Sequence, residues 1–556
     1  MNNDISVSLI NPNNKIDCIK VKYDTPIYEI TDKFNFPSEK IYAARVNNEI
    51  KSLDSRIKYK CTIEPVLSNT KSGALVYRRS LCLLLAAASH NLFPDRRLLV
   101  GHSLGYGYYY TFENEIETRQ EELDALTKEM KRLIKENIRI TTSIISYQEA
   151  EELFEKLNLT ETRKQLNFNC MSGVKINTIG DFSDLFFEPL VLSIGVLKVF
   201  DLMKYQNGFL LRFPKSSDPD TLMPFKDEPK LFEIYHKYKE WGKRINVTSA
   251  ASLNALIADG KINDFIEITE TYQQKNISKI ASQIIGKGTV RIVLMAGPSS
   301  SGKTTSAKKL ALELQAMGYM PKVISLDCYY VGRDKTPLGP DGKPDFECLE
   351  SLNIELLNQN LIDLFDGKEV NIPSYDFHTG TSYYEDDNKI KLAPNEILIM
   401  EGIHGLNEKL TSKVPLKFKF NIYLSALTQL NLDDHNRIST SDNRLLRRIV
   451  RDNNFRGKSA AGTIEMWPSV TKGEELHIFP FQNNADAILN TALDYELSVL
   501  RVYADPLLRQ VKPSQKEYSE ARRLLAFLDN FATIAPTAVP PRSIIREFIG
   551  DSAFKY

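Results

Sequence analysis

The stretch GPSSSGKTT, residues 297–305, decides the fold of the carboxyl-terminal half of the chain, because it matches the phosphate-loop pattern G-x-x-x-x-G-K-[ST]. An apolar run at 292–296 precedes it, and residues 306–315 carry apolar side chains at helical spacing. A strand, a glycine-rich loop and a helix are therefore expected in the order that a phosphate loop requires. In such a loop the backbone N–H groups and the helix N-terminus converge on phosphate oxygens. The sequence thus predicts a nucleoside triphosphate site.

Two side chains of this loop add chemistry to the backbone cradle. Lys303 supplies a positive charge for the β- and γ-phosphates, and Thr304 supplies a hydroxyl ligand for Mg²⁺. ATP and Mg²⁺ are therefore the expected cofactors. A chance match in a turn rich in glycine and serine is the alternative, but it does not explain the flanking strand and helix patterns. The residues expected to hold the nucleotide are Gly297, Ser299, Ser300, Ser301, Gly302, Lys303, Thr304 and Thr305.

The composition is that of an ordinary globular protein of 556 residues, for which about three or four domains are expected. Lys+Arg and Asp+Glu are equal at 71 each, so no global charge favours nucleic acid or an anionic membrane. The six cysteines never approach a C-x-x-C spacing, which disfavours a zinc site or a redox pair. No basic and apolar leader follows Met1 and no apolar run reaches the length of a membrane span, so a cytoplasmic location is expected.

Two further short segments, expected to be buried strands, each end in an acidic residue. Residues 322–326 precede Asp327, and residues 396–400 precede Glu401. Ligands of open α/β sheets gather at the carboxyl ends of the strands, so both carboxylates are expected beside the phosphate loop. Asp327 would then face the γ-phosphate, and Glu401 would be the second partner of Mg²⁺.

An arginine-rich segment follows at 442–452. Its arginines are spaced at i, i+3, i+4 and i+7, which places them on one face of a helix. Such a cationic stripe can neutralise charge that spreads onto a transferred phosphoryl group. The alternative is an ordinary solvated helix face with Asp442 and Asp452 as partners. The four arginines are Arg444, Arg447, Arg448 and Arg451.

The ordered set of these motifs, over about residues 288 to 500, closely resembles the uridine kinase and phosphoribulokinase superfamily, the uridine–cytidine kinases most of all. The resemblance implies an α/β P-loop kinase fold with a parallel sheet flanked by helices. It implies that Asp327 is the general base for the substrate hydroxyl and that Glu401 supports Mg²⁺. It also makes the arginine helix a mobile lid, with Arg447 and Arg451 in catalytic roles, Arg448 at the nucleotide and Arg444 at the substrate.

The acceptor-binding residues follow from the same resemblance. Glu347, in Asp-Phe-Glu, aligns with the ribose-binding acid of the family, and Tyr375 aligns with the base-packing tyrosine of its Y-D-F motif. Asp376 and His378 complete the expected substrate-binding set. The family carries a base-reading histidine five residues after that tyrosine, whereas this chain has Gly380 there. Base recognition by this chain is therefore open.

The amino-terminal half resembles other proteins. Residues 4–66 alternate apolar and polar positions, which predicts a small mixed β-sheet, and their order resembles the ubiquitin-like TGS module, a β-grasp fold. Residues 68–225 resemble the second, α+β domain of threonyl-tRNA synthetases through an apolar helix ending at Leu92-Phe93-Pro94 and the strings GYGYYYTF (105–112) and GDFSDLFFEP (180–189). The four metal- and proton-handling positions of the synthetase editing site fall here on Leu83, Ala87, Phe186 and Leu190. None of these can bind a metal or move a proton, so we expect a retained fold that has lost its editing chemistry.

These observations predict five segments: a TGS-like domain at 1–67, a synthetase-like domain at 68–225, a helical connector at 226–286, the P-loop domain at 287–510 and a helical extension at 511–556 that caps the kinase sheet. The expected function is ATP-dependent phosphorylation of a small-molecule hydroxyl, most readily the 5′-hydroxyl of uridine or a related nucleoside. A kinase for another small alcohol, such as a sugar phosphate or pantothenate, and an RNA-binding regulatory ATPase are the alternatives. The balanced charge argues against RNA as a partner. The sequence leaves open whether the chain forms a homo-oligomer.

Overall fold

The computed structural model describes residues 4–34, 36–113, 117–169, 171–187, 189–339, 342, 344–376 and 379–556. The chain divides into two compact units, neither of which is continuous in sequence. The first unit comprises residues 1–258, 429–438 and 508–532. The second comprises residues 259–428, 439–507 and 533–556. The division into five sequence segments stays a prediction.

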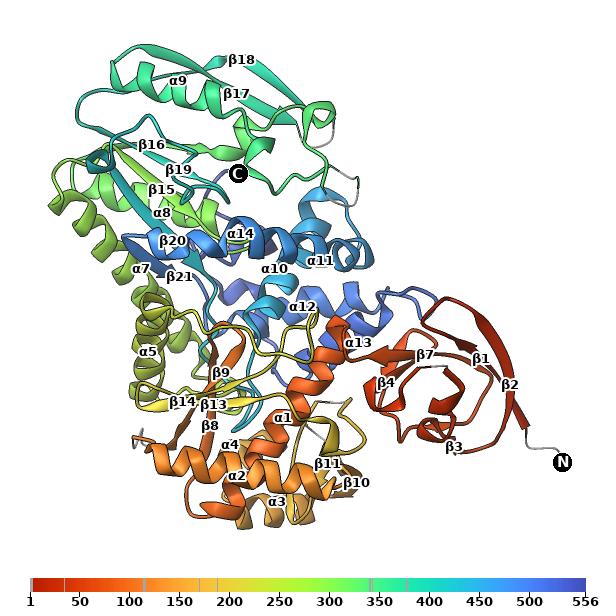
Figure 1. The fold of residues 1–556 in the computed structure, drawn as a ribbon. Coiled ribbons are helices and arrows are strands. Elements are labelled where there is room, and N and C mark those ends of the chain that lie inside the picture. The colour runs from red at the N-terminus through yellow and green to blue at the C-terminus, as the bar shows by residue number, and fades with distance from the viewer. Residues whose placement is uncertain are drawn as a thin grey trace. The chain divides into compact units, whose positions relative to one another are not determined.

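The first unit begins with a β-grasp module (Figure 1). Its sheet has the order β2-β1-β7-β4-β5, in which the central strands β1 and β7 run parallel and the other neighbours are antiparallel. Val7, Leu9, Phe34 and Ile63 fill its core. The alternation of apolar and polar residues thus correctly predicts a small mixed sheet. The strands are β1 (Asp4–Ile10), β2 (Ile16–Lys22), β3 (Thr25–Pro26), β4 (Ile41–Val46), β5 (Glu49–Lys51), β6 (Arg56–Ile57) and β7 (Cys61–Leu67).

The synthetase-like region packs two antiparallel sheets, β13-β14-β9-β8 and β10-β11-β12, around the long helix α1 (Lys71–Leu92). Nearly all residues in the middle of α1 are buried, which explains why the sequence of this helix is apolar on all of its faces. The strands are β8 (Leu98–Ser103), β9 (Gly107–Phe112), β10 (Thr141–Ser146), β11 (Gly173–Ile179), β12 (Phe182–Asp184), β13 (Asp201–Tyr205) and β14 (Gly208–Arg212). The helices are α2 (Gln120–Glu136), α3 (Tyr147–Lys156), α4 (Thr160–Asn169), α5 (Pro229–Arg244) and α6 (Ala250–Ala258).

A ten-residue segment from the carboxyl-terminal half, residues 429–438, belongs to this first unit. Asp434 is buried and accepts hydrogen bonds from the Thr162 amide (3.0 Å), in the first turn of α4, and from the Arg97 guanidinium (2.6 Å). Its neighbour His435 lies 2.6 Å through Nδ1 from the buried Asp184 of β12. A carboxylate at the start of α4 satisfies amides that lack an acceptor within the helix. The segment is therefore an integral part of the first unit.

The extension predicted at 511–556 contains the helix α13 (Tyr518–Leu528), and the expectation that this extension caps the kinase sheet stays a prediction. Residues 508–532 belong to the first unit. The side chain of Asn48 donates to the Pro513 carbonyl (3.0 Å), and the amides of Gln165 and Asn254 donate to the Asn530 carbonyl (2.9 and 2.8 Å). These polar contacts join positions far apart in sequence, so no local pattern shows them.

The second unit is built on a five-stranded parallel sheet of order β16-β19-β15-β20-β21 (Figure 1). Its strands are β15 (Ile292–Ala296), β16 (Met320–Ser325), β19 (Glu396–Glu401), β20 (Lys419–Ser425) and β21 (Ala487–Asn490). Alternate residues of β15 point to opposite faces. Val293 and Met295 pack with α7 (Ile262–Gly286) and α8 (Lys303–Ala316), whereas Ile292 and Leu294 pack with α9 (Ile354–Phe365). The predicted α/β P-loop fold is confirmed.

The remaining elements of the second unit surround the sheet. They are the hairpin β17 (Glu369–Asp376) and β18 (Thr381–Lys391), and the helices α10 (Thr440–Arg456), α11 (Ala460–His477), α12 (Glu496–Leu508) and α14 (Arg546–Ile549). None of the helices in the described ranges is long and apolar enough to cross a membrane.

Candidate active site

The phosphate loop connects β15, which is buried along its whole length, to α8. Gly302 has a φ of 76°, which L-residues with a side chain rarely adopt, and Gly297 passes so close to the Leu424 carbonyl that a Cβ would lie 2.4 Å from its oxygen. The hydroxyls of Ser300 and Ser301 are buried and make no hydrogen bond to any described residue. A phosphate held in the loop would supply the acceptors that these hydroxyls lack. The strand, loop and helix predicted from the sequence are confirmed.

Thr304 and Glu401 meet at the base of the loop. The Thr304 hydroxyl donates to Glu401 Oε1 over 3.1 Å, while Lys303 donates from Nζ to the Pro298 carbonyl (3.2 Å). Burial, and then the neighbouring Asp327, raises the pKa of Glu401 to about 7. A bound cation would relieve this buried negative charge, and hard oxygen donors are what Mg²⁺ prefers. The donor set therefore fits Mg²⁺.

This candidate metal site is sparse in protein ligands. No group of three or more His, Cys, Asp or Glu side chains that could hold a metal ion occurs among the residues that the structure describes. Mg²⁺ in phosphoryl-transfer sites keeps several waters and takes other ligands from the phosphates of the substrate. Thr304 and Glu401 would therefore hold the ion jointly with the nucleotide.

Asp327 lies in a 3₁₀ turn, Leu326–Tyr329, directly after β16. β16 and β19 pair in parallel, and Ser325 lies opposite Glu401. Asp327 and Glu401 therefore lie at the same edge of the sheet, where these two strands end. Burial raises the pKa of Asp327, while the positive charges of Lys303, Arg456 and Arg451 lower it. The predicted juxtaposition of two carboxylates and the loop lysine is thus present, and the role of Asp327 as a general base stays a prediction.

The arginine-rich segment forms helix α10, and Ser439 caps its N-terminus. Arg444 makes a bidentate pair with Glu474 (2.5 and 2.7 Å) and donates to the Ser299 carbonyl (3.1 Å). Arg448 donates to the Ser299 hydroxyl over 2.7 Å. Arg448 therefore lies at the phosphate loop, as expected of a nucleotide-binding residue. Arg444 instead holds a protein carboxylate, and its role at the substrate stays a prediction.

Arg447 points away from these partners. Its side chain is fully buried and donates to Glu496, to the Ser300 carbonyl (3.2 Å) and to the Thr491 carbonyl (2.8 Å). Arg451 is partly buried and pairs with Asp452 (2.8 Å). These contacts hold Arg447 beside the phosphate loop, and its predicted catalytic role stays a prediction.

Tyr375 and Glu347, which the family resemblance assigns to the acceptor, both lie near Tyr330. The rings of Tyr330 and Tyr375 lie 5.4 Å apart. Burial, and then Glu474, raises the pKa of Glu347 to about 7. Glu347 packs against Gly473 of α11, where a Cβ would lie 2.6 Å from the Cβ of Glu347. Two partly buried tyrosines beside a partly buried carboxylate offer both stacking and hydrogen bonding, and their role at the acceptor stays a prediction.

The predicted residues after Tyr375 have different outcomes. Asp376 accepts a hydrogen bond from the Thr379 hydroxyl (2.9 Å), and the predicted His378 lies outside the described residues. Gly380 has a φ of 74°, and a Cβ there would lie 2.8 Å from Arg333 Nε. A histidine cannot occupy that position without displacing Arg333. The departure from the family pattern at Gly380 is therefore built into the local structure.

Two carboxylates that sequence reasoning missed contact the phosphate loop. Glu474, from α11, accepts a hydrogen bond from the Ser299 amide (2.9 Å). Glu547, near the carboxyl end, accepts a hydrogen bond from the Thr305 amide (3.1 Å). They lie 175 and 242 residues away along the chain. Neither glutamate stands in a recognisable motif, so the sequence carries no signal that could have identified them.

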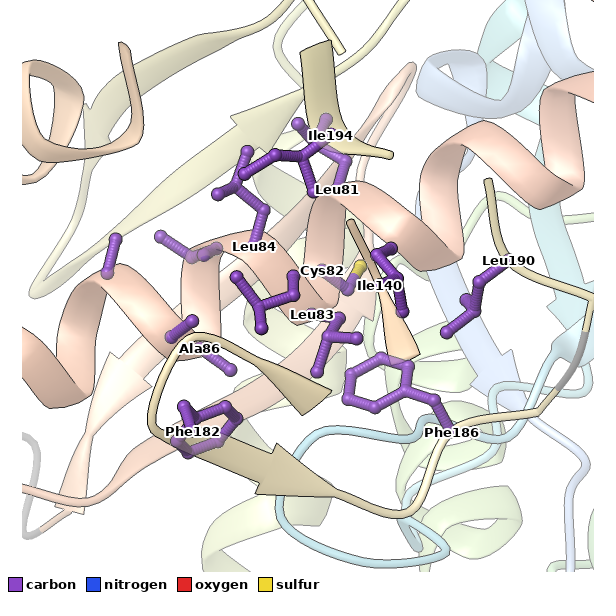
Figure 2. Close-up of a cluster of buried hydrophobic side chains, with 14 of the residues drawn as sticks. Leu81, Cys82, Leu83, Leu84, Ala86, Ile140, Phe182, Phe186, Leu190 and Ile194 are labelled. Atoms are coloured by element: carbon purple, nitrogen blue, oxygen red, sulfur yellow. The ribbon is translucent and has the colours of Figure 1, made fainter. Parts of the chain in front are cut away.

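The positions of the synthetase editing site lie in a hydrophobic core. Leu83, Ala87, Phe186 and Leu190 are all buried in one cluster with the rest of α1, and Figure 2 shows Leu83 beside the Phe186 ring. Aliphatic and aromatic side chains pack these positions, which agrees with the expected loss of editing chemistry.

Comparisons with known proteins match the two halves of the chain to different families. Residues 292–498 match the model of the phosphoribulokinase / uridine kinase family. A uridine kinase of Macrococcus caseolyticus is 32% identical over 200 residues, which cover 36% of this chain and 86% of that protein. The chain belongs to this family. A solved structure of a possible uridine kinase from Bacillus stearothermophilus is 18% identical and covers 39% of this chain and 98% of its own, with a TM-score of 0.26.

The amino-terminal half of this kinase-family chain is similar to threonine–tRNA ligases. The protein of Maridesulfovibrio salexigens is 30% identical over 170 residues, which cover 30% of this chain and 26% of that protein. That of Acetivibrio thermocellus is 29% identical over 223 residues and 35% of each chain. The chain thus spans about a quarter to a third of the length of these relatives.

Proposed function

We propose that the protein is an ATP- and Mg²⁺-dependent kinase that transfers the γ-phosphoryl group to the primary hydroxyl of a small molecule, most readily the 5′-hydroxyl of uridine or a related nucleoside. The observation that carries this proposal is the placement of Asp327 after β16, beside Glu401 and within the electrostatic influence of Lys303. A phosphate loop alone serves ATPases, GTPases and kinases equally. A half-buried carboxylate beside the loop lysine and Glu401 favours transfer to an alcohol.

In the proposed reaction, Asp327 takes the proton of the acceptor hydroxyl as its oxygen forms a bond to the γ-phosphorus. The bond between that phosphorus and the bridging oxygen breaks, and ADP leaves with the electron pair. The carboxyl pKa, raised by burial, brings Asp327 nearer to the working pH, which favours general-base catalysis. Lys303 and the loop amides hold the phosphates in place, and bound Mg²⁺ would neutralise charge on their oxygens.

The acceptor end supports a second candidate of the same reaction class. The family histidine is replaced by Gly380, and the Arg333 side chain fills the space that a side chain at 380 would need. Arg333 also acts electrostatically on Tyr375, where it lowers a hydroxyl pKa that burial raises. A cation at this position favours an acceptor that carries an anionic or strongly polar group, such as a sugar phosphate. Neither proposed reaction assigns a function to the synthetase-like half of the chain.

A single assay tests these proposals. Release of ADP is measured for the purified full chain with ATP and Mg²⁺ across nucleosides, sugar phosphates, pantothenate and structured RNA, with Lys303→Ala as the control. We expect turnover with a nucleoside that the control abolishes, together with a phosphorylated product. Turnover with a sugar phosphate alone would select the second candidate. Release stimulated only by RNA, with no phosphorylated small molecule, would refute both and favour a regulatory ATPase.

A further inference from the structure

The carboxyl-terminal segment of the second unit, residues 536–556, contacts the first turn of α8. Glu547 Oε2 accepts hydrogen bonds from the Thr305 amide (3.1 Å) and the Thr305 hydroxyl (2.6 Å). The hydroxyl of Tyr556 lies 2.8 Å from the same Thr305 hydroxyl. The Lys308 ammonium lies 4.7 Å from the centre of the Tyr556 ring. Two side chains of this segment therefore converge on one residue of the phosphate loop.

The segment is anchored, so Glu547 is held at the loop by a packed structure. Arg546 is buried and donates to the carbonyls of Pro536 (2.9 Å) and Val539 (2.6 Å). Phe548 is buried, and its carbonyl accepts from the Asn454 side chain of α10 (3.2 Å). Ile544 approaches so closely that a Cβ on Gly302 would lie 2.6 Å from its Cγ2 atom. The residues on both sides of Glu547 are thus fixed.

The Thr305 amide is one of the first-turn N–H groups of α8, which have no acceptor within the helix. In a phosphate loop these groups hold the phosphates of the nucleotide. A carboxylate resembles a phosphate in charge and acceptor geometry, and here it takes both the amide and the hydroxyl of Thr305. Two anions on one donor repel strongly where water is excluded. A nucleotide phosphate and Glu547 therefore cannot use Thr305 at the same time.

We propose that the carboxyl-terminal segment is an autoinhibitory element, in which Glu547 stands in for a phosphate group and competes with the nucleotide for the phosphate loop. Binding of ATP or ADP would displace Glu547 from Thr305 and loosen residues 544–556. The proposal rests on the proposed function only in that the loop binds a nucleotide. Anything that draws this segment away from α8 would raise the affinity of the loop for nucleotide.

The first test compares ADP binding to the full-length protein and its variants by isothermal titration calorimetry, at low ionic strength and without an acceptor. Glu547→Gln removes the charge and keeps the size, so it should bind ADP about tenfold more tightly or better, which corresponds to about 1.4 kcal/mol. Asp551→Asn is the matched control, because it removes the same charge from a side chain that is 93% exposed in the same segment and lies 3.9 Å from Arg546, in an ion pair whose exposed carboxylate contributes little to holding the segment. Its affinity should equal that of the wild type. Equal affinities for both variants, or weaker binding by Glu547→Gln, would overturn the proposal.

The second test needs no variant and remains informative if Glu547→Gln fails to fold. Hydrogen exchange of the wild-type protein is followed by mass spectrometry with and without saturating ADP. Exchange of the amides in residues 544–556 should become faster with ADP, because the segment loses its contact with Thr305. Slower exchange would mean that the segment closes over the nucleotide and would contradict autoinhibition. Both tests measure nucleotide binding alone. A failure to find any acceptor would therefore refute the kinase proposal and leave the proposal of an autoinhibitory segment intact.

Discussion

Replacing Arg447 by methionine should destabilise the second unit strongly, even though no substrate is involved. The Arg447 side chain is 0% exposed and that of Glu496 is 2% exposed, and the guanidinium donates to Glu496 through both Nε (3.1 Å) and Nη2 (2.5 Å). Loss of the guanidinium leaves the buried Glu496 carboxylate without its counter-charge and removes the hydrogen bond that Arg447 donates to the Thr491 carbonyl. Breaking a buried pair in this way costs about 3–5 kcal/mol. For a unit of this size the melting temperature should fall by roughly 6–20 °C.

The assay is thermal unfolding followed by circular dichroism for Arg447→Met, Glu496→Gln and the double variant. Because the two side chains share one contact, the double variant should lose less than the sum of the single losses, by roughly 1–3 kcal/mol. Arg456→Met is the matched control on the same helix. Its side chain is 46% exposed and lies 3.7 Å from Asp452, so its loss should stay below about 1 kcal/mol.

Turnover measured well below the melting temperatures separates the two roles of Arg447. If the side chain acts through packing, Arg447→Met and Glu496→Gln should retain similar turnover once folded. The reasoning is refuted if Arg447→Met melts like the wild type yet loses turnover far beyond Glu496→Gln. That result would support the catalytic role that the family resemblance implies for Arg447.

Three further changes test the site itself. Asp327→Asn should lower turnover by at least ~10²-fold with ADP affinity unchanged, because it removes the proposed base and leaves the loop intact; near-normal turnover would exclude Asp327 from the mechanism. Glu401→Gln should raise the Mg²⁺ concentration for half-maximal turnover by at least about tenfold, and superimposable titrations would contradict a metal role. The pKa of Glu347 is raised from 4.5 to about 7, so the stability that this group contributes is fully present below about pH 4.5 and is lost as the pH rises through 7. The melting temperature of Glu347→Gln, relative to the wild type, should therefore rise between pH 5 and 8, and a difference independent of pH would contradict the shift.

The parts of the site that follow from local order along the chain could be predicted. The apolar run before Gly297, the helix after Lys303 and the acids at Asp327 and Glu401 all lie where a strand ends and a loop begins, and the periodicity of the sequence shows this. The position of Arg448 at Ser299 also follows from helical spacing combined with the family resemblance.

The parts that depend on contacts between distant segments could not be predicted. Glu474 and Glu547 reach the loop from far along the chain, and their carboxylates are indistinguishable in sequence from solvated ones. The spacing of the arginines shows that Arg447 shares a helix face with Arg444, but not that Glu496 lies under one side of that face. Tertiary pairing of charges leaves no periodic trace in the sequence.

The insertion of Asp434 into the first unit has a consequence for how the protein is made. The ribosome finishes residue 258 long before it reaches residue 434, and at typical elongation rates the interval is roughly 10–35 s. During that time the amides at the start of α4 and the Arg97 guanidinium lack the Asp434 carboxylate that accepts their hydrogen bonds in the folded protein. The nascent amino-terminal half can therefore reach its final form only after most of the kinase sequence has emerged. A fragment that ends at residue 258 would lack this carboxylate permanently. The folding of the amino-terminal half therefore depends on the carboxyl-terminal half of the same chain.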